Sequence, residues 1–346
     1  MSESRQVTDA DPVALTGYGV YVPEEVITGQ AIAEQSGVPE EVVVEKMGVR
    51  EKRVCPTDGD NVTDMSVKAA EQALADAELD AEDLDMVLYH GSEYKDYVVW
   101  SAAANVAERL GTDDAFAVES YALCAGAPLA IRQAKSQLLA DAPETVLLVS
   151  ASREEDLVDY ENEASSFMFN FGSGASAAVL ETDPANERAR AVVRESAALT
   201  DGSFSEDVIM PAGGSREPTT HATVDAGLHT LDVPDPDGMK ERLADVSLAN
   251  FLDVADDALE RSGYDRDDLD FVALTHMKRS FHDLLTEKLD AKNYYLDEYG
   301  HVQSVDQLLA LDEGLARGKV ESGDTVLFLA AGTGYTWAAT VLEWRG

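Results

Sequence analysis

The fold class is decided by two similar stretches, QALADAELDAEDLDMVLYHG at residues 72–91 and DALERSGYDRDDLDFVALTH at residues 257–276. At an offset of 185 they match at seven of twenty positions, and each predicts a helix end, an acidic turn and an apolar strand. A second pair follows in the same order at an offset of 180, with ETVLLVSAS at 144–152 and DTVLFLAAG at 324–332. Two ordered pairs at nearly one offset indicate an internal duplication.

The chain is therefore predicted to form two similar α/β halves, residues 13–185 and 186–346. Short apolar runs bounded by Gly or Asp predict buried strands at 84–89, 145–150, 269–274 and 325–330. Helical periodicity predicts helices at 64–77, 102–110, 125–140, 242–262 and 304–317. Strands that alternate with helices predict crossover connections and largely buried sheets. The loop-rich stretch 200–240 is a candidate cover for a site.

The composition excludes several function classes. With 67 acidic and 26 basic residues the net charge is −41, which opposes binding to nucleic acid or anionic lipid. Because the acidic residues are spread along the chain between apolar segments, they predict a protein kept soluble in the salty cytoplasm of a halophile, and binding of cations is the alternative. No apolar run reaches the ~18 residues of a membrane span. The polar start lacks a signal-peptide pattern, so we expect a cytoplasmic protein.

Cys124 is a candidate nucleophile. An extended apolar segment leads into it, and a helix is predicted to begin at or just after it. The dipole and free amides at a helix N-terminus favour a thiolate there, and the small residues 125–127 allow a substrate to approach. A buried inert cysteine is the alternative. The second cysteine is Cys55, and two thiols alone cannot form a structural zinc site.

Other residues could act beside this cysteine. His276 ends an apolar strand, where α/β folds often keep functional groups, and His301 precedes a predicted helix. Glu93 follows the equivalent strand of the first half. Structural or solvated roles are the alternatives for all three. A glycine turn between two strands could aim a backbone amide at an oxyanion, and it consists of Gly332, Thr333 and Gly334.

From about residue 14 onward the chain resembles the β-ketoacyl-acyl-carrier-protein synthase III family of the thiolase superfamily. The resemblance rests on ordered motifs, namely TGYGVYVPEEVIT, KMGVREKRV, the Cys124 segment, FGSGASAAVLE, DGSFSEDVIMP, the His276 strand, DEYGH and GTGYTW. It implies the five-layered αβαβα thiolase fold with two duplicated halves, and a homodimer. It also implies acyl-coenzyme A or acyl carrier protein as partners, and no metal or redox cofactor.

The resemblance assigns roles to the candidate residues. Cys124 takes the place of the acyl-accepting nucleophile and His276 that of the active-site histidine. The loop Gly332 to Gly334 takes the place of the one that forms the oxyanion hole with the Cys124 amide. His301 stands where the family has an Asn that steadies the enolate formed when malonyl thioesters lose carbon dioxide.

Departures from the family pattern leave the substrates open. Val42 and Lys46 replace a Trp and an Arg that hold coenzyme A, and Met277, Lys278 and Arg279 follow His276 in place of Gln-Ala-Asn. We expect Lys46, Lys278 and Arg279 to bind substrate. Glu93 lies 31 residues before Cys124, as does a catalytic Glu in hydroxymethylglutaryl-CoA synthases, so a non-decarboxylating condensation that uses Glu93 or His301 is the main alternative. A simple acyltransferase and an inactive partner protein are further alternatives.

Overall fold

The computed structural model of the protein describes residues 13–140, 143–182 and 188–346. Its strands are β1 (Val13–Tyr21), β2 (Val26–Thr28), β3 (Glu51–Arg53), β4 (Met86–Tyr89), β5 (Phe116–Glu119), β6 (Thr145–Ser152), β7 (Gly174–Thr182), β8 (Ala191–Thr200), β9 (Phe271–Leu274), β10 (Lys292–Asn293), β11 (Thr325–Gly332) and β12 (Thr336–Trp344). Its α-helices are α1 (Gly29–Ser36), α2 (Val62–Ala77), α3 (Ala102–Leu110), α4 (Gly126–Leu138), α5 (His221–Asp225), α6 (Pro236–Ser262), α7 (Arg279–Leu289) and α8 (Asp306–Ala316).

The strand order repeats. The first five long strands lie in the order β5-β4-β6-β7-β1, and the second five lie in the order β10-β9-β11-β12-β8. In each set the two outer pairs are parallel and the other pairs are antiparallel. A short antiparallel pairing of β1 with β8 joins the sets into one ten-stranded sheet. Because each strand has a counterpart in the same position, the two sets are copies of one topology.

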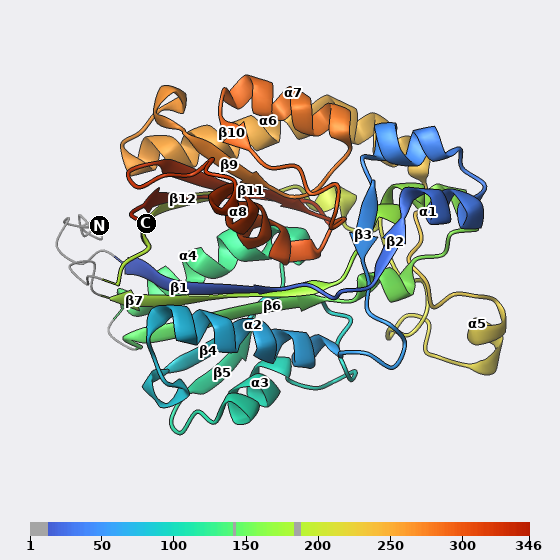
Figure 1. Ribbon diagram of the computed structural model, residues 1–346. Helices are drawn as coiled ribbons and strands as arrows, with labels where there is room; N and C mark the ends of the chain where they lie inside the picture. The colour runs from blue at the N-terminus through green and yellow to red at the C-terminus, as the bar shows by residue number, and fades with distance from the viewer. Residues whose placement is uncertain (1–12, 141–142, 183–187) are drawn as a thin grey trace, which may run out of the picture.

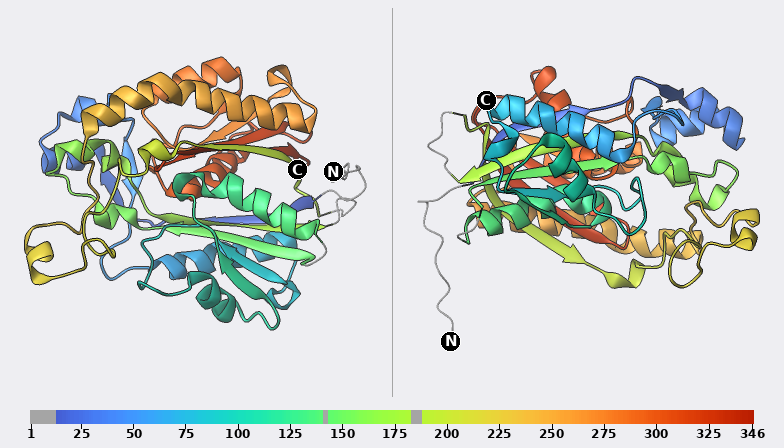
Figure 2. Two further views of the ribbon diagram at one scale, coloured as in Figure 1. Left: turned by 180° about the vertical axis from the view of Figure 1, so that it is seen from behind. Right: turned by 90° about the horizontal axis from the view of Figure 1, so that it is seen from below.

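Helices and sheets alternate in five layers (Figure 1). α6 and α7 cover the outer face of the second strand set, and α2 and α3 cover that of the first. α4 and α8 lie between the two sets and contact strands of both, as the view from behind also shows for α4 (Figure 2). The predicted five-layered αβαβα thiolase fold is confirmed.

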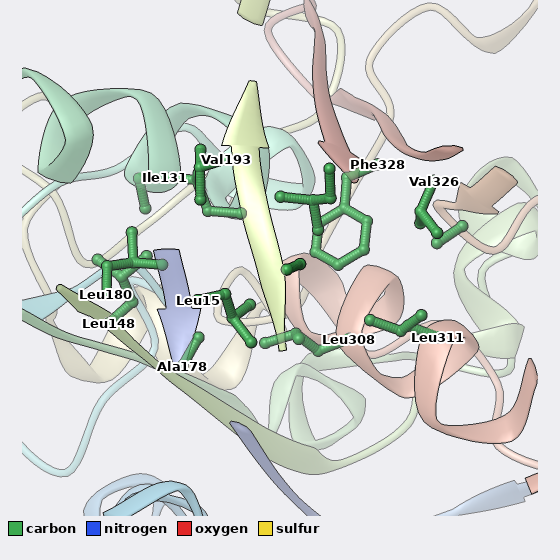
Figure 3. Close-up of a cluster of buried hydrophobic side chains, with 14 of the residues drawn as sticks. Leu15, Ile131, Leu148, Ala178, Leu180, Val193, Leu308, Leu311, Val326 and Phe328 are labelled. Carbon is green, nitrogen blue, oxygen red and sulfur yellow. The ribbon is translucent and has the colours of Figure 1, made fainter. Parts of the chain in front are cut away.

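The central layer is also the largest apolar core. Ile131 of α4 and Leu308 of α8 lie between strand residues such as Leu15, Leu148 and Phe328 (Figure 3). Branched side chains on both strand sets and on both helices exclude water from this layer. Burial of each such side chain contributes roughly 1.5–3 kcal/mol to the free energy of folding. This packing fixes the N-terminal ends of α4 and α8 against one another.

The acidic turn of the repeat has the same structural role in both halves. Asp85 accepts hydrogen bonds at Oδ2 from the backbone of Glu144 (2.8 Å) and Thr145 (2.9 Å) at the start of β6. Asp270 accepts one at Oδ2 from the backbone of Thr325 (2.9 Å) at the start of β11. Each carboxylate thereby ties its own strand to the next strand of the sheet. The acidic turn that the two stretches share is therefore explained by the same kind of hydrogen bond, from a carboxylate to the backbone of the neighbouring strand, in each half.

Most predicted elements form within two residues of their expected bounds, and α6 is the main exception. It begins at Pro236, six residues before the predicted start, within the loop-rich stretch. Asp235 accepts a hydrogen bond from the backbone of Gly238 (3.0 Å), and proline suits the first turn because its missing N–H would have no helical partner.

Two further sequence predictions concern domains and membranes. The predicted boundary between residues 185 and 186 lies outside the described residues, because these end at 182 and resume at 188, so the boundary stays a prediction. Among the described residues, no helix combines the length and apolar character needed to cross a bilayer.

Candidate active site

Cys124 lies in a tight turn between β5 and α4. The turn is a short 3-10 segment, Leu123–Ala125, and α4 begins at Gly126. Leu123 has a φ of 50°, which is unusual for a residue with a branched side chain. Such strained backbone persists where the surrounding structure holds it, and it often marks functional sites. The turn brings the buried thiol, 4% exposed, to the N-terminal end of the helix.

His301 and Asp306 extend from this thiol as a chain of contacts. His301 Nε2 lies 3.0 Å from Cys124 Sγ, and His301 Nδ1 lies 2.5 Å from Asp306 Oδ2. Burial alone lowers the pKa of His301, but the carboxylate of Asp306 and the thiolate of Cys124 outweigh it and hold the pKa well above the usual value. The imidazole is therefore placed to hold the thiol's proton, and Asp306 fixes its orientation.

The loop that carries His301 is fastened by the motif FGSG at 171–174. His301 donates its backbone N–H to Asn170 O (2.8 Å), and Gly172 donates its N–H to His301 O (2.9 Å). Gly300 has a φ of 76°, and a side chain there would lie 2.3 Å from Asn170 O. Glycine is thus required before His301, and the first half of the chain positions a histidine of the second half.

His276 is the second histidine of the site. It is 4% exposed, and its backbone N–H donates to Asp306 Oδ2 (2.7 Å), so one carboxylate holds both histidines. Within the described chain neither of its ring nitrogens has a hydrogen-bond partner. Burial, with the positive charge of His301, lowers the pKa of His276 well below its usual value. A neutral imidazole with a free N–H can donate a hydrogen bond to a substrate oxygen.

The glycine turn lies against the nucleophile. A Cβ added at Gly332 would lie 2.4 Å from Ala122 O and 3.1 Å from the backbone nitrogen of Cys124. Only glycine allows this approach. Gly334, with a φ of 104°, and Thr333 complete the turn between β11 and β12. Gly332, at the start of this turn, is thus next to the Cys124 amide, where an oxyanion could be bound.

Sequence reasoning missed three polar side chains of the site. Gln303 Oε1 accepts from Cys124 Sγ (3.1 Å), and Gln303 Nε2 donates to Glu154 Oε2. Asp306 is fully buried at the first residue of α8. A carboxylate five residues after a candidate histidine, at a predicted helix start, was a usable signal for Asp306. Glu154 could not be found in this way, because 149 residues separate it from Gln303.

Glu93 does not join these contacts. Its side chain is exposed, and within the described chain it has no hydrogen bond to Cys124, His276 or His301. Its neighbour Ser92 is 1% exposed and donates to Glu154 Oε1 (2.5 Å). Glu154, rather than Glu93, is therefore the carboxylate that is linked to Cys124 by hydrogen bonds through Gln303.

The predicted substrate-binding cations lie near one another at the edge of the site. The segment Val42–Met47, which contains Lys46, packs on α7, which begins at Arg279. The hydroxyl of Tyr295 links the two segments, because it donates to Met277 O (2.8 Å) and lies 3.5 Å from Met47 O. The guanidinium of Arg279 lies over the Tyr295 ring, 4.4 Å from its centre. Lys46 and Lys278 are exposed.

Comparisons with known proteins agree with this geometry. Residues 119–202 match the family model for 3-oxoacyl-[acyl-carrier-protein] synthase III, and residues 259–344 match the model for its C-terminal part. A β-ketoacyl-[acyl-carrier-protein] synthase III of Caldanaerobacter subterraneus is 27% identical over 334 residues, or 95% of this chain and 97% of the relative. One of Clostridioides difficile is 27% identical over 337 residues, or 95% and 98%.

Solved structures give the same result. The 3-oxoacyl-(acyl carrier protein) synthase III of Pseudomonas aeruginosa superposes with a TM-score of 0.83 at 24% identity, covering 97% of this chain and 99% of the other. The synthase III of Thermus thermophilus gives 0.80 at 25% identity, covering 96% and 99%. These relatives do not favour the hydroxymethylglutaryl-CoA synthase-like, simple acyltransferase or inactive alternatives. The chain is a condensing acyltransferase, and it is similar to the 3-oxoacyl-[acyl-carrier-protein] synthase III family in both matched segments and along nearly the whole length of these relatives.

Proposed function

We propose that the chain makes a β-ketoacyl thioester in a ping-pong reaction through an acyl group on Cys124. The observation that carries this proposal is the contact between Cys124 Sγ and His301 Nε2, backed by Asp306. A nucleophile, a base in reach of it and a third group that orients the base are the geometric signature of covalent catalysis. The proposed chemistry needs no metal or redox cofactor.

In the first half-reaction the thiolate of Cys124 attacks the carbonyl carbon of an acyl thioester. The electron pair moves to the carbonyl oxygen, and the backbone amides of Cys124 and of the turn Gly332 to Gly334 are the candidate donors to that oxyanion. When the carbonyl re-forms, the carrier thiolate leaves. It takes the proton that His301 had received from the thiol of Cys124.

In the second half-reaction a second thioester becomes a carbon nucleophile. A malonyl thioester does so by losing carbon dioxide, which leaves its electron pair in an enolate. The free ring N–H of the neutral His276 suits a hydrogen bond to the enolate oxygen. The enolate carbon then attacks acyl-Cys124, and the sulfur leaves as a thiolate.

The test of this function is to trap the intermediate and detect the product. The protein should take up a radiolabelled acyl group from an acyl thioester, and mass spectrometry should locate it on Cys124. Addition of malonyl thioester should then release labelled β-ketoacyl thioester and carbon dioxide. An unlabelled protein would contradict the proposal, and labelling without condensation would favour a simple acyltransferase.

For the carrier, we propose that Lys46, Lys278 and Arg279 hold the phosphates of coenzyme A or of the pantetheine arm of acyl carrier protein. Lys46 lies on a segment that contacts α7, and Lys278 and Arg279 lie at the start of α7, so three cations of a strongly acidic protein lie on contacting segments, which suits a polyanionic group. Lys278→Glu should raise KM for acyl-coenzyme A and leave KM for an acyl-pantetheine without phosphates unchanged. Lys240→Glu, at an exposed position of α6, is the matched control.

For assembly, we propose a homodimer formed through β5. This strand ends the sheet, and its side chains Phe116 and Val118 are 47% and 38% exposed. The nearby loop also exposes Val98 and Val99, at 86% and 99%. An exposed apolar end strand usually pairs or is covered. Phe116→Glu should shift the sedimentation coefficient from dimer to monomer, whereas Val224→Glu, at another exposed apolar position, should not.

For the environment, we propose that the protein needs high salt. At a net charge of −41, repulsion between acidic residues opposes folding when counterions are dilute. The thermal midpoint should therefore rise strongly between low and molar potassium chloride. A midpoint that stays constant or falls would contradict adaptation to salt.

A further inference from the structure

A second chain of buried polar side chains is hydrogen-bonded to Cys124, and His301 is not part of it. Gln303 Oε1 accepts from the thiol (3.1 Å), Gln303 Nε2 donates to Glu154 Oε2, and Ser92 Oγ donates to Glu154 Oε1 (2.5 Å). These three side chains are 4%, 7% and 1% exposed, respectively. The proposed mechanism gives none of them a role, although one of them touches the nucleophile.

The backbone at Gln303 shows that this contact is held in place. Gln303 has a φ of 57°, which is unfavourable for a residue with a Cβ. The turn Gln303–Val305 leads directly into α8, whose first residue is Asp306. Strain of about 1–3 kcal/mol persists only where the surrounding structure imposes it. The same short segment therefore places Gln303 against Cys124 and Asp306 against His301.

The amide of Gln303 can bond in two ways, and the protonation state of Glu154 selects between them. An ionised Glu154 accepts only, so it takes the NH₂ group of Gln303 and leaves the amide oxygen to accept the thiol proton of Cys124. A protonated Glu154 donates from Oε2, so it takes the amide oxygen and turns the NH₂ group toward the sulfur. Ser92 can donate to Oε1 in both states.

We propose that Cys124 and Glu154 share one proton across Gln303, whose amide turns over to match. In one state the sulfur is a thiol and Glu154 is a carboxylate. In the other the sulfur is a thiolate that accepts from Gln303, and Glu154 carries the proton. The sulfur releases its proton to solvent and Glu154 takes one up, so the total is unchanged. His301 keeps its two contacts in both states, Nδ1 with Asp306 Oδ2 and Nε2 with the sulfur.

The electrostatic setting allows both states. Burial raises the pKa of Glu154, and the hydrogen bond from Ser92, the charge of His301 and the hydrogen bond from Gln303 oppose that rise. Among the described residues, the charged or titratable groups that act on Glu154 or respond to it include His301, Glu93 and Tyr89. Glu154 is thus a positioning residue, which acts on the nucleophile through Gln303 and deepens the proposed acyl-Cys124 mechanism.

The test measures thiolate rather than turnover, so it succeeds or fails independently of the proposed condensation. In a Cys55→Ala background, the alkylation rate of Cys124 by iodoacetamide and the thiolate absorbance would be followed from pH 5 to 9. Glu154→Gln mimics the protonated acid, because its NH₂ group can donate to the oxygen of Gln303. It should speed alkylation at neutral pH about tenfold, because a larger share of the sulfur is thiolate. Glu161→Gln, at an exposed position, should change nothing.

A double-mutant cycle separates the relay from a simple effect of charge. Gln303→Met keeps the length of the side chain but removes both amide groups, so Glu154→Gln should have no effect in that background. Thermal midpoints of all variants would confirm folding, and Gln303→Leu replaces Gln303→Met if the latter unfolds. Equal alkylation profiles for the wild type and Glu154→Gln would overturn the proposal. The same acceleration with and without Gln303 would also overturn it.

Discussion

The two halves of the molecule build the same turn at the start of their central helices and use it differently. In the first half a residue with positive φ, Leu123, precedes Cys124 and α4. In the second half a residue with positive φ, Gln303, precedes Ser304 and α8. At the offset of 180 seen in the sequence, Cys124 and Ser304 are counterparts.

The two counterparts have opposite surroundings. Cys124 Sγ contacts His301 and Gln303, both from the second half. Ser304 Oγ lies 2.6 Å from Ser150 Oγ and donates to His90 O (3.0 Å), so it is held between groups of the first half. One copy of the turn therefore presents the thiol proposed as nucleophile, and the other copy forms hydrogen bonds across the interface between the halves.

Asp306 adds to this asymmetry. Its counterpart in the first half is Gly126, where a side chain would lie 2.7 Å from His90 O and 2.8 Å from Ser304 Cβ. No carboxylate fits beside Ser304, whereas Asp306 accepts from the backbones of His276 and Val302 and from His301. The first half thus supplies Cys124 to the candidate site, and the second half supplies both histidines and their carboxylate.

Removal of the nucleophile should have the largest effect. Cys124→Ala should abolish acylation, because the sulfur of the other cysteine, Cys55, contacts the sulfur of Met65 rather than a histidine. Burial raises the pKa of Cys55 to about 12, so Cys55→Ala should leave acylation intact. Trapping of a radiolabelled acyl group measures both variants. Acylation that persists in Cys124→Ala would show that the turn of the first half is not the nucleophile turn.

Asp306→Asn should have the next largest effect. An amide has one acceptor atom, and it cannot replace two carboxylate oxygens that accept from two backbone N–H groups and His301. We expect the rate of Cys124 acylation to fall about 100-fold or more, in the range for loss of acid–base catalysis. Rapid-quench acylation measures this fall. Asp267→Asn, at an exposed position, is the control, and equal rates would remove Asp306 from the site.

His301→Asn should slow the acylation of Cys124, because it removes the proposed base, and it should also change the second half-reaction. Malonyl decarboxylation should be kept or improved, because an amide can still donate to an enolate, while turnover with a non-malonyl acceptor should fall. Carbon dioxide and condensed product, measured from pH 6 to 9, test this expectation. If both rates and both pH profiles equal those of the wild type, His301 acts only as a hydrogen-bond donor, and it is not a base in the reaction.

The same variant makes a prediction for stability. The raised pKa of His301 means that the folded state keeps a proton that an unfolded histidine loses above about pH 6.5. This contribution is complete below that pH and is lost as pH rises through the folded pKa. The stability advantage of the wild type over His301→Asn should therefore shrink with rising pH in urea unfolding. An advantage that grows with pH would contradict the protonated state.

Ser304→Ala should have the smallest effect on catalysis. It removes two buried hydrogen bonds at the interface between the halves and should lower the free energy of unfolding by about 1–3 kcal/mol. Because the side chain of Ser304 bonds to Ser150 and His90 and, within the described chain, has no hydrogen bond to Cys124, acylation at saturating substrate should stay within about twofold of the wild type, a change of less than about 0.5 kcal/mol in the barrier. A large loss of acylation would mean that both turns take part in the chemistry.

Much of the fold could be predicted because its signals are local. The strands of the repeat are short apolar runs, and an acidic turn precedes each one, so periodicity and turn chemistry were sufficient to detect them. The helix at 102–110 was predicted with its observed bounds, because Ser101 caps its start and Gly111 ends it with a φ of 83°. The residues and their places beside predicted strands and helices supplied Cys124, His276 and His301 as candidates, the resemblance to a known family assigned their roles, and those roles remain predictions.

By itself, the sequence determined the duplicated α/β architecture, the net charge and the place of Cys124 before a helix. Only the tertiary structure decided that Glu154 rather than Glu93 is linked to the thiol, and that Asp306 and Gln303 complete the site. Residue type and spacing do not encode these contacts, because they join groups up to 179 residues apart. Close packing between the two halves brings those groups together, and it fixes the N-terminal ends of α4 and α8 face to face.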